Sequence, residues 1–136
     1  MGGETLSEEN VTEKETTKKW LHKIANKQQE KDPRGLNQHE PGAKMDSGKI
    51  RAGVLADFSR ALEALAKIGD YGCRKYSRSG WLMVPNGYER YKDAFYRHLI
   101  ASESELNDPE SGLPHKWHML WNAAAMIELE QRGANK

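Results

Sequence analysis

Residues 109–130 read PESGLPHKWHMLWNAAAMIELE, and this stretch decides how the chain folds. Proline is tolerated in the first turn of a helix and serine can cap free amide groups, so Ser111 or Pro114 can start a helix here. The helix is expected to continue to Arg132 and to stop at Gly133, because glycine readily takes the left-handed conformation that closes a helix.

Two stripes of side chains run along this predicted helix. One is formed by His115, His118, Met119, Asn122 and Met126, and the other by Trp117, Leu120, Trp121, Ala124 and Ile127. Both stripes cannot face water, so we expect a largely buried helix whose imidazole and amide groups need hydrogen-bond partners.

Two further helices are predicted upstream. The first, from about Gly53 to Tyr76, has apolar side chains at helical spacing, and the second, from about Tyr88 to Ser104, has His98 on its apolar side. The loop between them carries Trp81 and Met83 as apolar anchors. No segment alternates with a period of two. The fold class is therefore all-α, a small bundle of three principal helices with an N-terminal helical arm. The apolar positions of the first helix are Val54, Leu55, Phe58, Ala61, Leu62, Leu65 and Ile68.

The chain has 136 residues, which is enough for one ordinary domain. Residues 1–45 form a polar arm and connector, partly helical, and residues 46–133 can bury a core. Trp20, Leu21 and Ile24 give the arm an apolar patch too small to stabilise an isolated helix. The arm helix is therefore expected either to fray or to dock on the domain or on a neighbouring subunit, and we expect a homo-oligomer.

Charge and composition exclude several classes of protein. The formal net charge is +1, so no diffuse basic field attracts nucleic acid, and phosphate recognition must come from a local cluster. No apolar run has the length of a membrane span, and no signal peptide is visible, so we expect a cytoplasmic protein. The single cysteine, Cys73, excludes an internal disulfide and a thiolate metal cage.

The polar side chains of the second and third predicted helices suggest a shared site. Asp93 and Arg97 are four residues apart, and His98 lies on the same helix. Facing helices that offer His, Asn, Asp and Arg can line a polar pocket, which is a usual place for a ligand site in a bundle.

Five sequence motifs occur in an order that resembles a known family. They are MDSGKIRAGVL, YGCRKY, Trp81, RYKDAFYRHL and DPESGLPHKWHMLWNAAAMIELE, and they cover residues 46–130. The order is similar to the phage and prophage dATP/dGTP diphosphohydrolase, N-terminal-like family. Its members are similar to the all-α NTP pyrophosphatases, which use Mg²⁺ held by helix carboxylates to cleave a nucleoside triphosphate to a monophosphate and pyrophosphate.

The resemblance implies roles for matching residues. Basic and amide side chains would bind the nucleotide, histidines would lie near the reacting water or the base, and carboxylates would bind Mg²⁺. The nucleotide-binding candidates are Lys49, Arg51, Lys75, Arg90, Arg97 and Asn122, and the histidines are His98, His115 and His118. The metal candidates are Asp93, which matches the second-helix motif, and Asp57 and Glu63, which lie on either side of Arg60, where the family has a glutamate. His115 and His118 could instead share a transition metal. Asp108 and Glu110 could merely organise the turn beside Pro109.

One departure from the family pattern bears on catalysis. All-α pyrophosphatases carry paired glutamates three residues apart, and this chain has no Glu-x-x-Glu; its one Glu-x-x-Asp, Glu105 to Asp108, runs into Pro109. Three hypotheses therefore stay open. The first is a metal-dependent (deoxy)nucleoside triphosphate pyrophosphohydrolase. The second is a phage protein that sequesters a nucleotide or nucleotide signal without turnover. The third is a small helical assembly protein.

Overall fold

The computed structural model describes residues 30–133, in two compact units, Met1–Leu55 and Ala56–Lys136. The predicted helical arm, with Trp20, Leu21 and Ile24, lies outside the described residues.

The described part of the first unit consists mainly of turns arranged around the buried carboxylate of Asp32. Its two oxygens accept hydrogen bonds from the backbone N–H groups of Arg34, at 2.7 Å, and Lys44, at 2.8 Å. Lys49 pairs with Glu30 at 2.8 Å. These bonds join the two ends of the connector and give it a defined conformation. A surface hollow in this unit is lined by Asp32 and its neighbours. The candidate histidines His98, His115 and His118 are not among its lining residues.

Helices are the only extended regular elements in the described part of the chain, which confirms the all-α prediction. The 3-10 helix η1 (Ala52–Phe58) contains the boundary between the units and is followed by α2 (Ser59–Lys75). The second unit continues with a short 3-10 helix, η2 (Gly80–Met83), and with α3 (Gly87–Ala101) and α4 (His115–Gln131).

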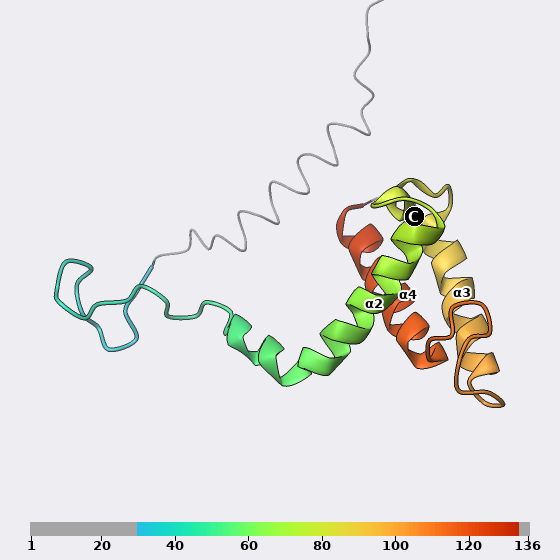
Figure 1. Ribbon diagram of the computed structural model, residues 1–136. Helices are drawn as coiled ribbons and strands as arrows, with labels where there is room; N and C mark the ends of the chain where they lie inside the picture. Colours follow the sequence, from blue (N-terminus) through green and yellow to red (C-terminus); the bar gives the residue numbers. More distant parts are fainter. Residues whose placement is uncertain (1–29, 134–136) are drawn as a thin grey trace, which may run out of the picture. The chain divides into compact units, whose positions relative to one another are not determined.

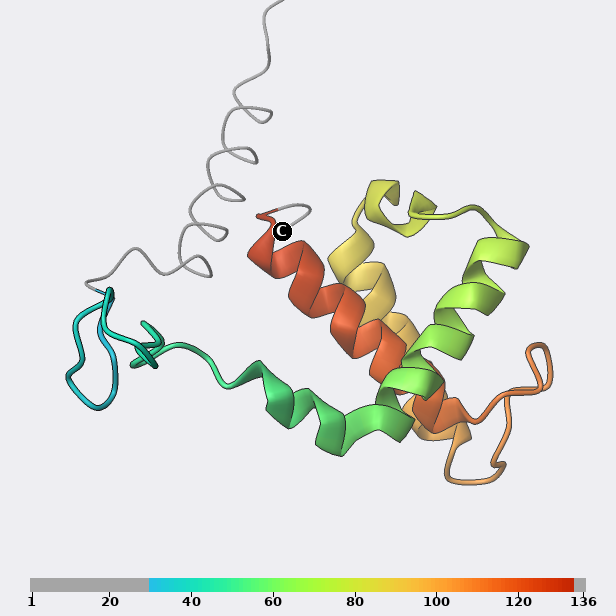
Figure 2. The same cartoon turned by 60° about the vertical axis from the view of Figure 1, so that its left-hand side comes forward.

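Helix α4 is the central element of the second unit. It packs along α3 and is crossed by α2 (Figures 1 and 2). The core consists of Ala64 and Ile68 from α2 and of Ala125 and Leu129 from α4, and Leu129 is fully buried. A Cβ atom on Gly69 would lie 3.6 Å from the indole nitrogen of Trp121, an ordinary van der Waals distance, so α2 faces the Trp121 ring at this position.

An aromatic cluster holds η2 against α3 and α4. The rings of Trp81 and Tyr91 each meet Trp121 edge to face, with ring centroids 5.5 Å apart in both pairs. The Tyr91 hydroxyl also donates a hydrogen bond of 2.9 Å to the carbonyl of Trp81. Trp81 is thus the apolar anchor that the sequence predicts, and Trp121 belongs to the core.

Several details differ from the sequence predictions. The first predicted helix begins as the 3-10 helix η1, and α3 ends three residues before the predicted Ser104. Met83 is 84% exposed and anchors nothing. Ile127, on the second stripe of α4, is 59% exposed, because only one side of α4 is covered by α2 and α3. Apolar periodicity identifies one side of a helix but does not specify a partner for it.

The ends of α4 follow the predicted punctuation. Pro114 occupies the N-cap position, so the helix starts at His115 and Ser111 is not its cap. At the other end, Gly133 has a φ angle of +67°, as expected for a residue that closes a helix. Within residues 30–133, no helix is both long enough and apolar enough to cross a bilayer.

Candidate functional site

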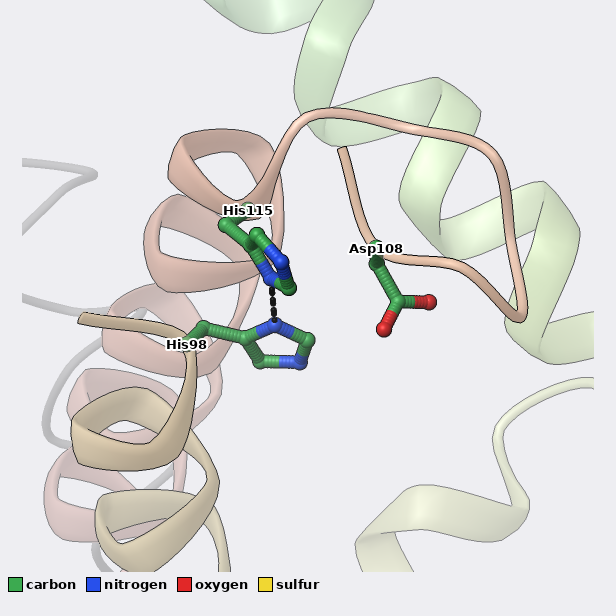
Figure 3. Close-up of side chains that lie close together, drawn as sticks. All are labelled: His98, Asp108 and His115. Carbon is green, nitrogen blue, oxygen red and sulfur yellow. Dashed lines mark hydrogen bonds between the residues drawn. The ribbon is translucent and has the colours of Figure 1, made fainter. Parts of the chain in front are cut away.

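Three histidine rings meet where the end of α3 lies beside the start of α4. The Nδ1 atoms of His98, in the last turn of α3, and His115, the first residue of α4, are 2.8 Å apart (Figure 3). The ring of His118, one turn further along α4, stacks on that of His98 with centroids 4.3 Å apart and planes 7° from parallel. The two helices therefore bring together residues separated by 17 positions in the sequence.

The loop between α3 and α4 folds back on itself and places Asp108 beside these rings. Asn107 and Pro114 form an isolated antiparallel bridge, and the N–H of Gly112 donates to the carbonyl of Asp108 at 2.8 Å. Gly112 has a φ angle of +71°, which few other residues adopt readily. The loop is closed by its own backbone, and the Asp108 carboxylate lies beside the two rings (Figure 3).

Each side chain of the cluster has a hydrogen-bond partner that fixes its orientation. An oxygen of Asp108 accepts from the Ser111 N–H at 2.8 Å. The Ser111 hydroxyl lies 2.7 Å from Nε2 of His118, which is also 3.8 Å from the Asp108 carboxylate. The Asn122 amide donates to the carbonyl of His118 at 2.8 Å. The buried polar side chains His118 and Asn122 of α4 therefore have the hydrogen-bond partners that their burial requires.

Glu105 holds the far side of the His115 ring. Its carboxylate lies 3.3 Å from Nε2 of His115, while Nδ1 of the same ring faces His98. His115 is only 2% exposed. A hydrogen on Nε2 would be donated to Glu105, and the Nδ1 lone pair would then point into the cluster.

Lys75, at the end of α2, brings a positive charge to the edge of the cluster. Its ammonium group forms an ion pair with Glu110, in the same loop as Asp108. Tyr71, one turn before Lys75, meets His118 edge to face with ring centroids 6.1 Å apart. All three helices of the second unit therefore contribute to the cluster or to its edge.

Burial sets the charge state of the cluster. Burial lowers the pKa of His98 to about 4, and the neighbouring His118 ring adds to this effect. Burial also lowers the pKa of His118, against the opposing effect of Asp108. Burial alone would raise the pKa of Asp108, but hydrogen bonds from Ser111 and the nearby histidines bring it below its usual value. At neutral pH, His98 and His118 are thus neutral bases beside an ionised carboxylate.

Lys75 and Glu110 remain fully charged because each stabilises the charged form of the other. The hydrogen bond to Glu110 raises the pKa of Lys75, and the same bond lowers the pKa of Glu110. Lys75 is therefore a permanent cation, available to a phosphate that displaces Glu110.

The structure brings together only some of the residues that the sequence nominates. Lys75, His98, His115, His118 and Asn122 lie in or beside the cluster. Arg90, Arg97, Asp57, Glu63 and Asp93 are at exposed positions of the second unit, and Lys49 and Arg51 belong to the first unit.

The carboxylates nominated for Mg²⁺ have other surroundings. Glu63 pairs with Lys67 at 2.9 Å, and the ion pairs found between residues 30 and 133 do not include Asp57 or Asp93. In the described part of the chain, one set of side chains has metal-ligand spacing: His98, Asp108 and His115 offer donor atoms that all lie within 4.8 Å of one another.

Two acidic residues of the site are not among the candidates that the sequence predicts. The sequence favours a turn for Asp108, and Glu105 belongs to a pattern that ends at Pro109. Their positions depend on the bridge between Asn107 and Pro114, which no periodicity reveals. The run DPESG before a histidine-rich helix start was the available signal.

Comparison with known proteins gives one match, to a family model. No curated protein and no solved structure matches the chain. A family model described as dATP/dGTP diphosphohydrolase, N-terminal, matches residues 39–136, which include every residue of the cluster. The chain belongs to the dATP/dGTP diphosphohydrolase, N-terminal family.

Proposed function

We propose that this protein hydrolyses purine deoxynucleoside triphosphates to a monophosphate and pyrophosphate in a metal-dependent reaction, at the cluster formed by α3, α4 and the loop 107–114. The observation that carries the proposal is the meeting of His98, His115 and His118 with Asp108, inside the region that matches a family named for dATP and dGTP hydrolysis.

Phosphate binding is the first requirement, and Lys75 supports it. A triphosphate carries several negative charges, and catalysis of phosphoryl transfer depends mainly on positioning and on neutralising them. Lys75 lies at the edge of the cluster, where it forms an ion pair with the exposed side chain of Glu110 and lies over the Tyr76 ring. A divalent ion, Mg²⁺ in the first instance, would supply further charge neutralisation when bound.

Proton transfer is the second requirement. Water adds to phosphorus, pyrophosphate leaves, and one proton of the water must be accepted. A neutral imidazole can accept it, but a pKa of about 4 makes His98 a weak base at neutral pH. Burial also lowers the pKa of His118, but the Asp108 carboxylate 3.8 Å from its Nε2 opposes that shift, so we assign His98 to positioning and His118 to the proton.

A second candidate is nucleotide binding without turnover. The observation that favours it is that Asp57, Glu63 and Asp93 are all at exposed positions and that Glu63 is paired with Lys67. Such a protein would hold its ligand by the same histidines and Lys75, and would return it intact.

Incubation with a panel of deoxy- and ribonucleoside triphosphates tests both candidates. Pyrophosphate and retained nucleotide are measured together, with Mg²⁺, with other divalent ions and with chelator. We expect pyrophosphate from dATP or dGTP only when an ion is present. His118→Gln should abolish release, whereas His39→Gln, at an exposed position of the first unit, should not. Nucleotide recovered intact in every condition would overturn hydrolysis, and lack of binding would overturn both candidates.

A further inference from the structure

We propose that His98, Asp108 and His115 form a binding site for a divalent transition-metal ion such as Zn²⁺, distinct in chemistry from the Mg²⁺ expected of a nucleotide hydrolase. This inference does not rest on the proposed function, because it concerns the affinity of the protein for an ion in the absence of nucleotide.

The donor atoms decide the class of ion. Two imidazole nitrogens and one carboxylate oxygen are available from the three side chains. Imidazole suits Zn²⁺ and its neighbours in the first transition series, whereas Mg²⁺ prefers oxygen ligands and retains water. Three protein ligands with a fourth position open to water or a substrate atom are the usual composition of a catalytic zinc site.

The spacing of the donors is suitable for a single ion. Donors about 2.0–2.1 Å from a tetrahedral ion lie roughly 3.3–3.4 Å from one another. The three donors here lie within 4.8 Å of one another, and the two Nδ1 atoms are 2.8 Å apart. The separations in the structure thus lie on either side of the spacing that a single bound ion requires.

Outer contacts orient two of the three ligands. Histidine ligands of metals usually donate their second N–H to a carboxylate or carbonyl group, which fixes the ring. Glu105 lies 3.3 Å from Nε2 of His115 and leaves Nδ1 of that ring for the ion. Asp108 is held in the same way by the Ser111 N–H at 2.8 Å. In this arrangement, Glu105 orients the His115 ring toward the ion.

Cobalt absorption provides a direct test with the full-length chain free of affinity tags. Co²⁺ is titrated into the protein without nucleotide, its visible d–d bands are recorded, and Zn²⁺ or Mg²⁺ is then added. We expect one Co²⁺ per chain, displacement by Zn²⁺ and no displacement by Mg²⁺. No d–d bands of a protein-bound ion, or equal displacement by Mg²⁺, would overturn the proposal.

Variants assign the ion to this cluster. Asp108→Asn should weaken Co²⁺ binding by at least about tenfold, and Glu105→Ala, which removes only an outer contact, by about 10–100-fold. The control His39→Asn changes a histidine of the first unit and should leave affinity unaltered. Circular dichroism confirms that each variant is helical. Should Asp108→Asn not fold, the exposed Glu105 side chain still permits the test. Unchanged affinity in a folded Glu105→Ala protein, or loss of binding in His39→Asn, would overturn the assignment.

Discussion

The Nδ1 atoms of His98 and His115 lie 2.8 Å apart, although the two residues belong to different helices. At this distance the two nitrogens share one proton, so at least one ring carries no charge. The contact joins the last turn of α3 to the first residue of α4 at the point where Asp108 approaches (Figure 3). The helix junction and the polar cluster are therefore the same structural feature.

The burial of His98 predicts a loss of stability in acid. Its pKa falls from 6.5 in the unfolded chain to about 4 in the folded protein, so the unfolded state binds more protons between these values. The stability contributed by the neutral ring is complete above pH 6.5 and is lost as the pH falls toward 4. Solvent screening of the partly buried ring reduces the effect to roughly 1–2 kcal/mol.

Urea unfolding of the metal-free protein at a series of pH values measures this loss. His98→Gln should flatten the dependence of the unfolding free energy on pH, while His39→Gln should not. Identical pH dependence in His98→Gln and the unchanged protein would show that His98 is not the group responsible.

Gly112 is expected to be essential to the shape of the loop. Its φ angle of +71° is costly for alanine, although a Cβ atom there would meet nothing within 4 Å. Gly112→Ala should therefore lower the unfolding free energy by about 1–2 kcal/mol through backbone strain alone. Gly72→Ala, a helical position with equal space, should instead be neutral or stabilising by up to about 1 kcal/mol. Equal changes of the unfolding free energy in the two variants would show that the backbone at Gly112 is not strained by alanine.

Lys75 is expected to contribute to nucleotide affinity. Lys75→Gln removes a charge-assisted hydrogen bond to phosphate, worth about 1.5–3 kcal/mol, or roughly 10–100-fold in Kd. Titration calorimetry with a non-hydrolysable dGTP analogue measures the change. Lys67→Gln is the matched control, because Lys67 is also on α2 and paired with a glutamate, yet lies over the Trp117 ring. A similar loss in both variants would mean that α2 attracts nucleotides only by its general charge.

The helices and the histidine stripe were predictable because they are local properties of the sequence. Ile68 is buried at a position that periodicity selects, and His115 and His118 share one side of α4. The fully buried Leu129, in contrast, belongs to neither of the two predicted stripes. The partners of the histidines were not predictable in the same way. Glu105 and Asp108 reach them only because Asn107 pairs with Pro114, a contact between residues on either side of a turn.

The apolar residues of η1 show that periodicity does not predict burial. Val54 and Phe58 fit a helical apolar pattern, but they lie in or at the end of a 3-10 helix and are exposed. Spacing along the sequence reports which residues share a side of a helix, whereas their burial depends on which other element covers that side.

Replacing Leu129 tests how much the core contributes to the stability of the protein. It is fully buried, so Leu129→Ala should lower the unfolding free energy by about 2–5 kcal/mol, through lost burial and the cavity left behind. Ile127→Ala, two positions away and 59% exposed, should cost much less. Comparable losses by urea unfolding would indicate that Ile127 is covered in solution, as a homo-oligomer would require.

The claim that nucleotides bind at the histidine cluster is tested most directly by nuclear magnetic resonance of the histidine rings. A non-hydrolysable dGTP analogue is added to the full-length protein, and the ¹H–¹⁵N ring signals are followed. We predict that the signals of His98, His115 and His118 shift together and saturate, while that of His39 stays in place. Saturable binding that leaves the three cluster signals unmoved would contradict the claim.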